Sequence, residues 1–259
     1  MSRALAYLRR LNWDGIGFFI AVIIVWEIAA ILADSFVFPR ATVVADMLWN
    51  DRATLAAQAL ATLRRALVGF VIALAIALPT GLFIGRIPLL ADLVEPLTEF
   101  LRPLPPIAVI PLAMMLLGIG DSAKLVVVVY GAAFPILVNT IDAVRVQDPI
   151  QSRVARSLRL TAIERMVLMD LPASTPRILS GVRLSITVAL LLAVVSEMLL
   201  STDGLGDYLR QAQTTFSMAR VLAGIIVIAV ISLAVSAIAN RLTRPFVDWH
   251  IRRSAGNGT

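Results

Sequence analysis

The chain contains no cysteine, and His250 is the one histidine among its 259 residues. Without cysteine, disulfides, thiol catalysis and cysteine-ligated metal sites are excluded. His250 stands in a basic C-terminal segment, where a solvent-exposed side chain is more common than a metal ligand. The sequence also lacks a Walker A motif, HExxH, GxSxG and CxxC. It therefore shows no motif with which it could bind and hydrolyse a nucleotide on its own.

Charge is scarce as well: only 15% of the residues are charged, 59% are hydrophobic, and the mean hydropathy is +0.88. A soluble domain of this size would have too little polar surface to cover itself, so the composition predicts an integral membrane protein. The net charge is +6, and all but one of the 23 basic residues are arginine. In a membrane protein such an excess marks cytoplasmic loops, and we do not expect nucleic-acid binding.

Six apolar segments predict six transmembrane helices in a single domain over residues 1–259. They cover residues 16–33, 66–85, 104–118, 125–144, 184–200 and 221–240. The first is long for a signal peptide and lacks a cleavage site, so an uncleaved helix is expected. Apolar positions at helical spacing in 42–63 predict one or two interfacial helices, and 86–102 predicts a polar link.

The distribution of basic residues predicts the orientation in the membrane. Six spans place both termini on the same side. If that side is the cytoplasm, the cytoplasmic segments hold 16 lysines or arginines and the outer segments hold 7. This bias predicts cytoplasmic termini and a cytoplasmic loop over residues 145–183.

Residues 101–120, which include the third predicted span, contain Pro103, Pro105, Pro106 and Pro111, which a straight helix would not tolerate. Broken helices at membrane depth occur where they are buried in protein or line a cavity, so this segment is the first candidate for a translocation path. A merely kinked packing helix remains the alternative. The candidate path residues are Pro105, Pro106, Pro111, Asn139, Ser196 and Glu197.

Two glutamates lie inside predicted spans. Glu27 either faces protein or a cavity, or sits near the outer headgroups or pairs with a neighbouring helix. Glu197 is a gate or a helix-to-helix hydrogen bond. If the solute is an anion, a carboxylate would repel it, so we expect Glu197 to brace the structure or pair with an arginine.

The most polar stretch between spans is the arginine loop, residues 151–183, which carries six arginines. Val154, Leu158 and Ala162 recur with later apolar residues at roughly helical spacing. This pattern predicts a short amphipathic helix that lies in a groove of another protein or on lipid headgroups. Leu171-Pro172 and then Pro176 are expected to end that helix.

The arginine loop resembles a signature found in permease subunits of bacterial ABC importers. This signature begins with Glu-Ala-Ala, followed after three residues by Gly. Nine residues further on come a hydrophobic residue, any residue, and Leu-Pro. Ala155, Met169, Leu171 and Pro172 match it without a gap, whereas Arg153 replaces Glu and Arg159 replaces Gly. Over about residues 35–250 the chain is similar, in order and spacing, to the permeases for nitrate, sulfonate, taurine and bicarbonate. The segments that carry this resemblance are EPLTEFLRPLPPIAVIPLAMMLLGIGDSAK, FPILVNTIDAVRVQDP, LPASTPRILSGVRLSITVALLLAVVSEML and GLGDYL.

The resemblance implies an all-α integral membrane fold with six transmembrane helices, the ABC importer type I permease fold, and a cytoplasmic coupling helix. It implies a transport subunit in the bacterial inner membrane, not an enzyme. No cofactor is expected in the chain itself, because a partner binds the ATP. The implied partners are two copies of an ABC ATPase, a second permease chain in a homodimer, an extracytoplasmic substrate-binding protein, and the lipid bilayer.

The substrate implied is a small solute, such as a sulfonate, nitrate or bicarbonate. Related permeases for thiamine precursors, riboflavin-like compounds or aromatic acids remain an alternative. The residues implied in ATPase coupling are Ala155, Arg156, Leu158, Arg159, Leu160, Glu164, Leu171 and Pro172. At position 159 a glycine would adopt a positive φ easily and let the chain turn between two short helices, whereas Arg159 would not.

Two other classes remain open from the residues alone. An ion-gradient-driven transporter would use Glu27 and Glu197 as carriers, but no internal repeat supports a transporter of repeated halves. A membrane-bound enzyme or scaffold would need clustered histidine, aspartate or glutamate at the membrane face, which a single histidine does not favour.

Overall fold

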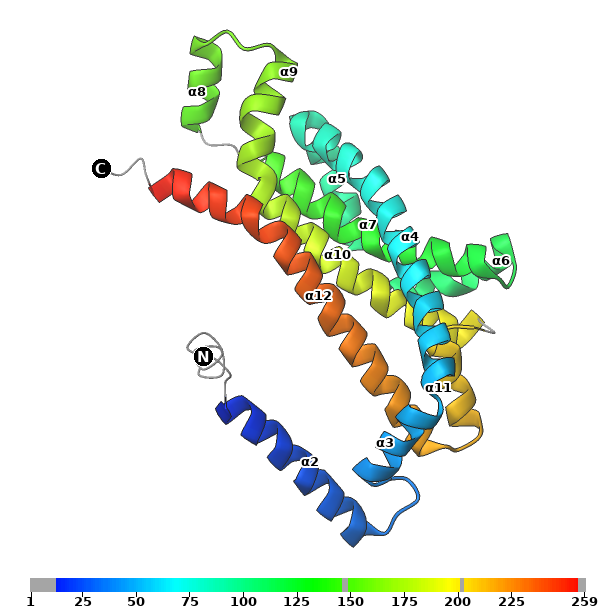
Figure 1. Cartoon of the computed structure of the whole chain (residues 1–259). Coiled ribbons are helices and arrows are strands. Elements are labelled where there is room, and N and C mark those ends of the chain that lie inside the picture. The colour runs from blue at the N-terminus through cyan, green and yellow to red at the C-terminus, as the bar shows by residue number, and fades with distance from the viewer. Residues whose placement is uncertain (1–12, 146–148, 201–202, 256–259) are drawn as a thin grey trace.

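The computed structural model of the chain describes residues 13–145, 149–200 and 203–255. Every regular element in these residues is a helix (Figure 1), which confirms the expected all-α class. In chain order the elements are α2 (Trp13–Ala33), α3 (Ala41–Asn50), α4 (Arg52–Arg86), α5 (Pro88–Leu101), η1 (Pro106–Val109), α6 (Ile110–Leu117), α7 (Asp121–Arg145), α8 (Pro149–Ser157), α9 (Ala162–Arg165), the π-helical turn η2 (Met166–Asp170), α10 (Leu171–Leu200), α11 (Leu205–Thr214) and α12 (Met218–Ala255).

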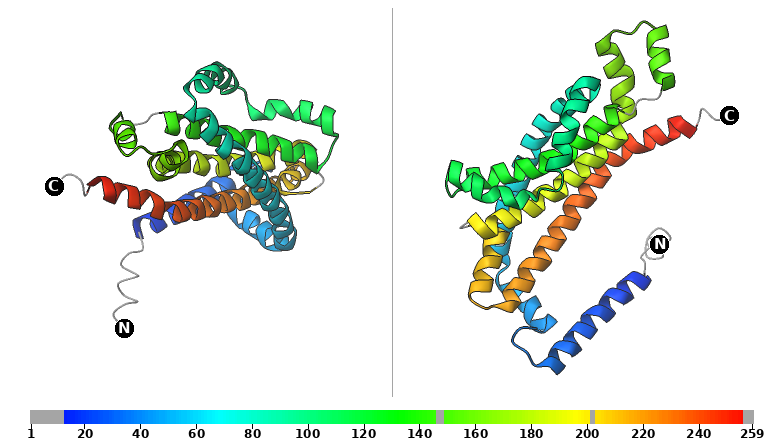
Figure 2. Two further views of the ribbon diagram at one scale, coloured as in Figure 1. Left: turned by 90° about the horizontal axis from the view of Figure 1, so that it is seen from above. Right: turned by 180° about the vertical axis from the view of Figure 1, so that it is seen from behind.

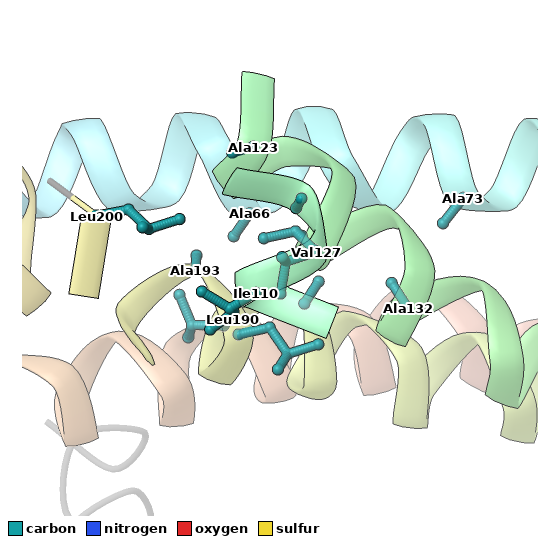
Figure 3. Packing of buried hydrophobic residues seen from close by; sticks show 13 residues of the cluster. Ala66, Ala73, Ile110, Ala123, Val127, Ala132, Leu190, Ala193 and Leu200 are labelled. Atoms are coloured by element: carbon teal, nitrogen blue, oxygen red, sulfur yellow. The ribbon is translucent and has the colours of Figure 1, made fainter. Parts of the chain in front are cut away.

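The centre of the molecule is formed by α4, α7 and α10, with α6 against α7 and with α11 and α12 against α10 (Figures 1 and 2). Small and β-branched side chains fill the space between these helices (Figure 3). The buried cluster consists of Ala66, Ala73, Ile110, Ala113, Ala123, Val127, Val128, Ala132, Ala189, Leu190, Leu192, Ala193 and Leu200. Because so many members are alanines, the helix axes can approach closely.

A stripe of small residues on α4 makes the closest approach. Gly69, Ala73, Ala77, Gly81 and Gly85 follow one another at every fourth position, and all five are buried. A β-carbon added to Gly81 would lie 2.8 Å from Cβ of a threonine on α7, and one added to Gly85 would lie 2.9 Å from a backbone oxygen of α7. Small residues at this spacing allow two membrane helices to pack backbone to backbone.

Polar side chains fasten α10 to the carbonyl groups of α7. Ser174 donates a hydrogen bond to the carbonyl of Ala143 at 3.0 Å, and Ser185 donates to the carbonyl of Ala132. Between them Gly181 packs against Asn139. In an apolar solvent such bonds keep helix polar groups satisfied and fix the register of the two helices.

Within the described residues, four helices are long and apolar enough to cross a membrane: Arg52–Arg86, Asp121–Arg145, Met166–Leu200 and Met218–Pro245. A fifth span would combine α5 with η1 and α6, which meet at a bend of 89°. The expected break in the proline-rich segment is therefore confirmed. The expected number of six spans is not, because the apolar part of α2, Gly17–Ala33, is shorter than the other four.

Several boundaries differ from those expected. Most of the predicted polar link over 86–102 is helical, since residues 88–101 form α5. Pro172 and Pro176 do not end a helix: α10 begins at Leu171, directly after the π-helical turn, and continues to Leu200. The residues of 52–63 belong to the same helix as the predicted second span, because α4 starts at Arg52.

α2 stands apart from the central helices and is joined to the rest mainly through α3 (Figure 1). The carboxylate of Glu27 accepts hydrogen bonds from the backbone N–H of Thr42 at 3.2 Å and from its hydroxyl at 2.9 Å. Thr42 is in the first turn of α3, so Glu27 caps that helix from another element. Trp26 donates a hydrogen bond to the carbonyl of Pro39 at 3.1 Å. Of the two expectations for Glu27, the structure supports pairing with a neighbouring helix.

Candidate functional site

The first half of the arginine loop folds into a hairpin of two short helices, α8 and α9, at one end of the molecule (Figures 1 and 2), and residues 171–183 form the start of α10. The single amphipathic helix that the spacing predicted is therefore wrong, because the chain turns between Ser157 and Ala162. Through the π-helical turn, α9 continues directly into α10. The hairpin is thus attached to a helix that runs through the centre of the bundle.

The turn between the two helices is a Schellman motif. The backbone N–H of Leu160 bonds to the carbonyl of Ala155 at 3.1 Å, and that of Arg159 bonds to the carbonyl of Arg156 at 3.1 Å. In this motif the residue after the helix cap is left-handed and is usually glycine. Here Arg159 occupies it with a φ of 51°. The turn that a glycine would permit is therefore kept, although the side chain makes it costly.

A capping box starts α9. The hydroxyl of Thr161 accepts a bond from the backbone N–H of Glu164 at 3.3 Å, and the carboxylate of Glu164 accepts from the backbone N–H of Thr161 at 2.8 Å. The Thr161 hydroxyl also donates to that carboxylate at 2.7 Å. Because these donors stabilise the charged form, the pKa of Glu164 lies below its ordinary value. Glu164 therefore has a structural role in shaping the hairpin.

The exposed side of the hairpin carries a defined set of groups. Arg153, Arg156 and Arg159 are exposed, and between them Val154 and Leu158 are 43% and 64% exposed. Of the remaining predicted coupling residues, Ala155 is only 3% exposed and holds α8 in place, while Leu160, Leu171 and Pro172 are half-buried. The structure thus brings the predicted coupling residues into one hairpin and its junction with α10.

Ion pairs fix the neighbouring ends of the helices. Arg145 at the end of α7 bonds to Asp92 at 2.5 Å and to Glu95 at 2.8 Å, which ties α7 to α5. Beside the hairpin, Arg165 lies 3.5 Å from the buried carboxylate of Asp170 in the π-helical turn. A cavity of about 260 Å³ is lined by Arg145, Arg165 and Asp170 among others. Charged side chains from the end of α7 and from the base of the hairpin therefore border the same space.

The six candidate path residues lie in two groups. Pro105, Pro106 and Pro111 surround the bend before α6, where Pro106 packs against Gly131 of α7. Asn139 is half-buried on the inner side of α7 and donates to the carbonyl of Pro135 at 2.8 Å. Ser196 and Glu197 lie at the far end of α10. Whether these residues line a translocation path remains a prediction.

Glu197 is the centre of a buried ionic network at the far end of α10. Its side chain is fully buried and pairs with Arg65 of α4. It also accepts a hydrogen bond from the Thr62 hydroxyl at 2.7 Å and one from the backbone N–H of Gly206 at 3.1 Å. The expectation that Glu197 pairs with an arginine as a brace is confirmed.

The network extends from Arg65 to the surface. Arg65 is 5% exposed and lies 2.9 Å from Asp121 and 3.0 Å from Asp203. Lys124, 4% exposed, lies 2.6 Å from Asp121 and 3.3 Å from Asp203. Two cations therefore meet three carboxylates, and α4, α7 and α10 are joined at this end. Sequence reasoning missed the other four charged members of this network, because they come from distant segments that no motif connects.

Both glutamates proposed as ion carriers are therefore engaged in structural contacts. Glu27 caps α3, and Glu197 is paired with a buried arginine. Among the residues that the structure describes, no group of three or more histidine, aspartate or glutamate side chains is arranged to hold a metal. This geometry does not support the hypotheses of an ion-gradient-driven transporter or a membrane-bound enzyme.

The comparisons with known proteins agree on one family. Residues 77–246 match the family described as binding-protein-dependent transport system inner membrane component. A probable ABC transporter permease of Brucella abortus is 32% identical over 74% of this chain and 77% of that protein. The Escherichia coli taurine permease is 29% identical over 73% of this chain and 69% of its own length. The putative aliphatic sulfonate permease of Bacillus subtilis is 31% identical over 71% of this chain and 67% of its own length.

The nitrate permease of Leptolyngbya laminosa is 31% identical over 69% of this chain and 64% of its own length. The bicarbonate permease of Synechococcus elongatus is 29% identical over 73% of this chain and 66% of its own length. Among solved structures, a chain of the methionine ABC transporter MetNI in an inward-facing conformation superposes with a TM-score of 0.64 at 19% identity. It covers 78% of this chain and 98% of that chain, which shows the fold. The chain is thus a membrane-spanning permease subunit of an ABC importer, with ATP hydrolysis on a separate chain, and it belongs to the binding-protein-dependent transport system inner membrane component family.

Proposed function

We propose that this permease imports a small oxyanion or organic acid, such as a sulfonate, nitrate or bicarbonate. The observation that carries the proposal is that relatives of 29 to 31% identity bear the names of taurine, sulfonate, nitrate and bicarbonate permeases. These solutes share a compact anionic group. Uptake measured with each labelled solute decides which member of this class is transported.

The complex proposed has two copies of this chain in a homodimer, two ATPase subunits and one extracytoplasmic binding protein. In this arrangement the α8–α9 hairpin faces the cytoplasm and binds the ATPase, and ATP is held by that subunit. The chain itself uses no cofactor. The excess of arginine in the arginine loop supports the cytoplasmic placement.

The continuity of α9, the π-helical turn and α10 supports a mechanical role for the hairpin. Met166–Leu200 is one uninterrupted helical segment of 35 residues. It starts at the hairpin and ends at the Arg65–Glu197 network, which joins it to α4 and α7. A displacement of the hairpin by the ATPase would therefore be passed to the opposite end of the bundle. Such an element can bias two global states, inward-facing and outward-facing.

The path proposed for the solute passes the proline bend before α6 and the inner side of α7. The half-buried Asn139 amide would supply a neutral polar contact along it. Few charged side chains lie in the spans. We expect selectivity to reside mainly in the binding protein that delivers the solute.

The experiment is uptake of labelled taurine, an alkanesulfonate, nitrate and bicarbonate by cells that express the chain with its ATPase and binding protein. We expect uptake of one of the four, and its loss when the ATPase carries an inactivating Walker A substitution. Uptake that survives loss of the ATPase would contradict the importer mechanism. Uptake of a thiamine precursor or an aromatic acid, with none of the four, would move the substrate to the alternative class.

A further inference from the structure

The cavity at the base of the hairpin is rich in arginine. Its volume is about 260 Å³, and four of its seven lining residues are charged. They come from the end of α4, the end of α7, α9 and the π-helical turn, and they are Arg86, Arg145, Arg165 and Asp170. Among the lining residues that the structure describes, three guanidinium groups therefore share this space with one carboxylate. We call it the arginine cavity.

The arginine cavity lies at the depth where lipid headgroups are expected. The candidate spans Arg52–Arg86 and Asp121–Arg145 both end at residues that line it, and Met166–Leu200 begins next to Arg165. Three central helices therefore leave the apolar layer at the same place. Charged side chains at the ends of transmembrane helices reach the membrane surface, so these guanidinium groups lie at the level of the lipid phosphates.

Exposed apolar side chains stand next to the lining residues in the chain. Val167 and Leu168 of the π-helical turn, between Arg165 and Asp170, are 56% and 64% exposed. On α5, Leu89 directly follows a lining proline and is 77% exposed. A basic pocket between membrane helices with apolar side chains beside it suits an anionic amphiphile better than a free ion.

Arg145 keeps hydrogen-bonding capacity for a ligand. A guanidinium group has five N–H donors. The bonds to Glu95 and Asp92 use one donor on each of the two terminal nitrogens of Arg145. Both of these carboxylates are more than half exposed, and ion pairs so open to water are weak. A phosphate can therefore share this guanidinium group, and arginine binds phosphate oxygens through paired hydrogen bonds.

We propose that the arginine cavity binds the phosphate of an anionic phospholipid through Arg86, Arg145 and Arg165. The acyl chains lie along the neighbouring exposed apolar side chains. The bound lipid connects the ends of α4 and α7 to the start of Met166–Leu200, the helical segment that carries the hairpin. It thereby stiffens the joint between the hairpin and the bundle. This site takes neither the solute nor ATP and goes beyond the proposed function.

The test measures retention of added phosphatidylglycerol or phosphatidylcholine by the full chain, purified in detergent micelles. Native mass spectrometry counts the bound lipids, and the thermal unfolding temperature is measured on the same samples. We expect the chain to retain phosphatidylglycerol in preference to phosphatidylcholine and to unfold at a higher temperature with it. Arg86→Gln and Arg145→Gln should each weaken phosphatidylglycerol binding roughly fivefold.

A second variant acts in the opposite direction. Asp170→Asn removes the negative charge from the arginine cavity, so it should tighten binding of phosphatidylglycerol. Damage to the fold alone would not produce a gain in affinity. If either glutamine variant unfolds early, Asp170→Asn and the charge-preserving variants Arg86→Lys and Arg145→Lys, which should retain the lipid preference, decide the question.

The matched control removes two exposed arginines from α12 at the same end of the bundle, Arg241→Gln with Arg244→Gln (Figure 1). These positions lie at the end of the span Met218–Pro245 and do not line the arginine cavity. The control should leave the preference for phosphatidylglycerol unchanged.

Three results overturn the proposal. Equal retention of the two lipids by the unaltered chain would exclude a site for anionic lipid. Equal weakening in the control variant would assign the preference to the general charge of this membrane surface. If inorganic phosphate or glycerol phosphate raises the unfolding temperature as much as phosphatidylglycerol does, the arginine cavity binds a soluble phosphate. None of these results bears on ATP-driven uptake, so the importer proposal is decided by its own experiment.

Discussion

At the residue scale, Arg159 occupies a backbone conformation that disfavours its own side chain. A left-handed residue with a β-carbon costs roughly 1–2 kcal/mol relative to glycine, partly offset by the greater flexibility of glycine in the unfolded chain. We expect Arg159→Gly to stabilise the hairpin by about 1 kcal/mol. The measurement is hydrogen exchange of residues 149–165, which reports local opening.

The control for this prediction is Arg156→Gly, inside α8, where glycine should destabilise the helix by about 1 kcal/mol. Faster exchange in Arg159→Gly would show that the side chain contributes contacts that outweigh the strain. The substitution also removes a positive charge from the exposed surface of the hairpin. A variant that is more stable and yet binds the ATPase more weakly would separate the two roles of this residue.

Glu164 gives the hairpin a dependence on pH. Its pKa is lowered because the Thr161 hydroxyl and backbone N–H donate to its carboxylate. The capping box is therefore complete above the ordinary pKa of glutamate and is lost as the pH falls through the lowered value. We expect exchange in 161–165, corrected for the intrinsic pH effect, to rise on acidification. Glu164→Gln should remove this acid-induced rise in exchange. If the rise persists in that variant, another titrating group causes it.

Arg65 and Glu197 form a buried pair whose members depend on one another. Arg65→Met would leave the fully buried Glu197 carboxylate without its cation, which costs about 3–5 kcal/mol. The double variant Arg65→Met with Glu197→Gln should recover a large part of this loss. Thermal and denaturant unfolding of the unaltered chain, Arg65→Met, Glu197→Gln and the double variant gives the coupling free energy between the two side chains. Arg64→Met, at the exposed neighbouring position, is the control and should be nearly neutral.

At the element scale, the small-residue stripe of α4 sets the distance to α7. The β-carbon of Gly85→Ala would lie 2.9 Å from the backbone oxygen of Ile141, and backbone cannot move aside cheaply. We expect a loss of about 1–3 kcal/mol in unfolding free energy. Gly17→Ala in α2 is the matched control, since its β-carbon meets nothing within 4 Å. Equal stability of the two variants would show that α4 and α7 can separate freely.

The sequence predicted elements where a single local signal was enough. Apolar runs located the central helices, and four prolines located the bend before α6, because both effects act within one segment. Helix ends were predicted poorly. α4 extends to Arg52 and α10 starts before Pro176, since an apolar run marks the part of a helix in the membrane and not its polar extension.

The candidate site was predictable to a similar extent. The loop was located by its arginines, and the Thr161–Glu164 spacing is a readable capping box that was overlooked. The hairpin turn was not predictable from Arg159 alone, because the residue contradicts the conformation it adopts. The network around Glu197 joins Arg65, Asp121 and Asp203 from separate segments, and only the packing of α4, α7 and α10 brings them together.

At the scale of the whole molecule, α10 joins two ends of the bundle that differ in their polar contacts. The hairpin lies at one end, and the network of Arg65 and Glu197 lies at the other. Ion pairs between α5 and α7 stabilise the first end. In the mechanism proposed above, a permease that alternates between two states needs a stiff connection between its ATPase and its outer end, and the continuous helical segment Met166–Leu200 would supply it.

The orientation of these two ends in the membrane can be tested directly, because the chain has no cysteine and any introduced thiol is unique. Ser157→Cys lies in the hairpin and Gln213→Cys lies at the end of α11; both positions are exposed. The bias of arginine predicts that a membrane-impermeant maleimide labels Ser157→Cys only in inside-out vesicles and Gln213→Cys only in right-side-out vesicles. The reverse pattern would place the hairpin outside the cell, where no ATPase could reach it. Labelling of both positions from one side would mean that Met166–Leu200, the candidate span that lies between them, does not cross the membrane.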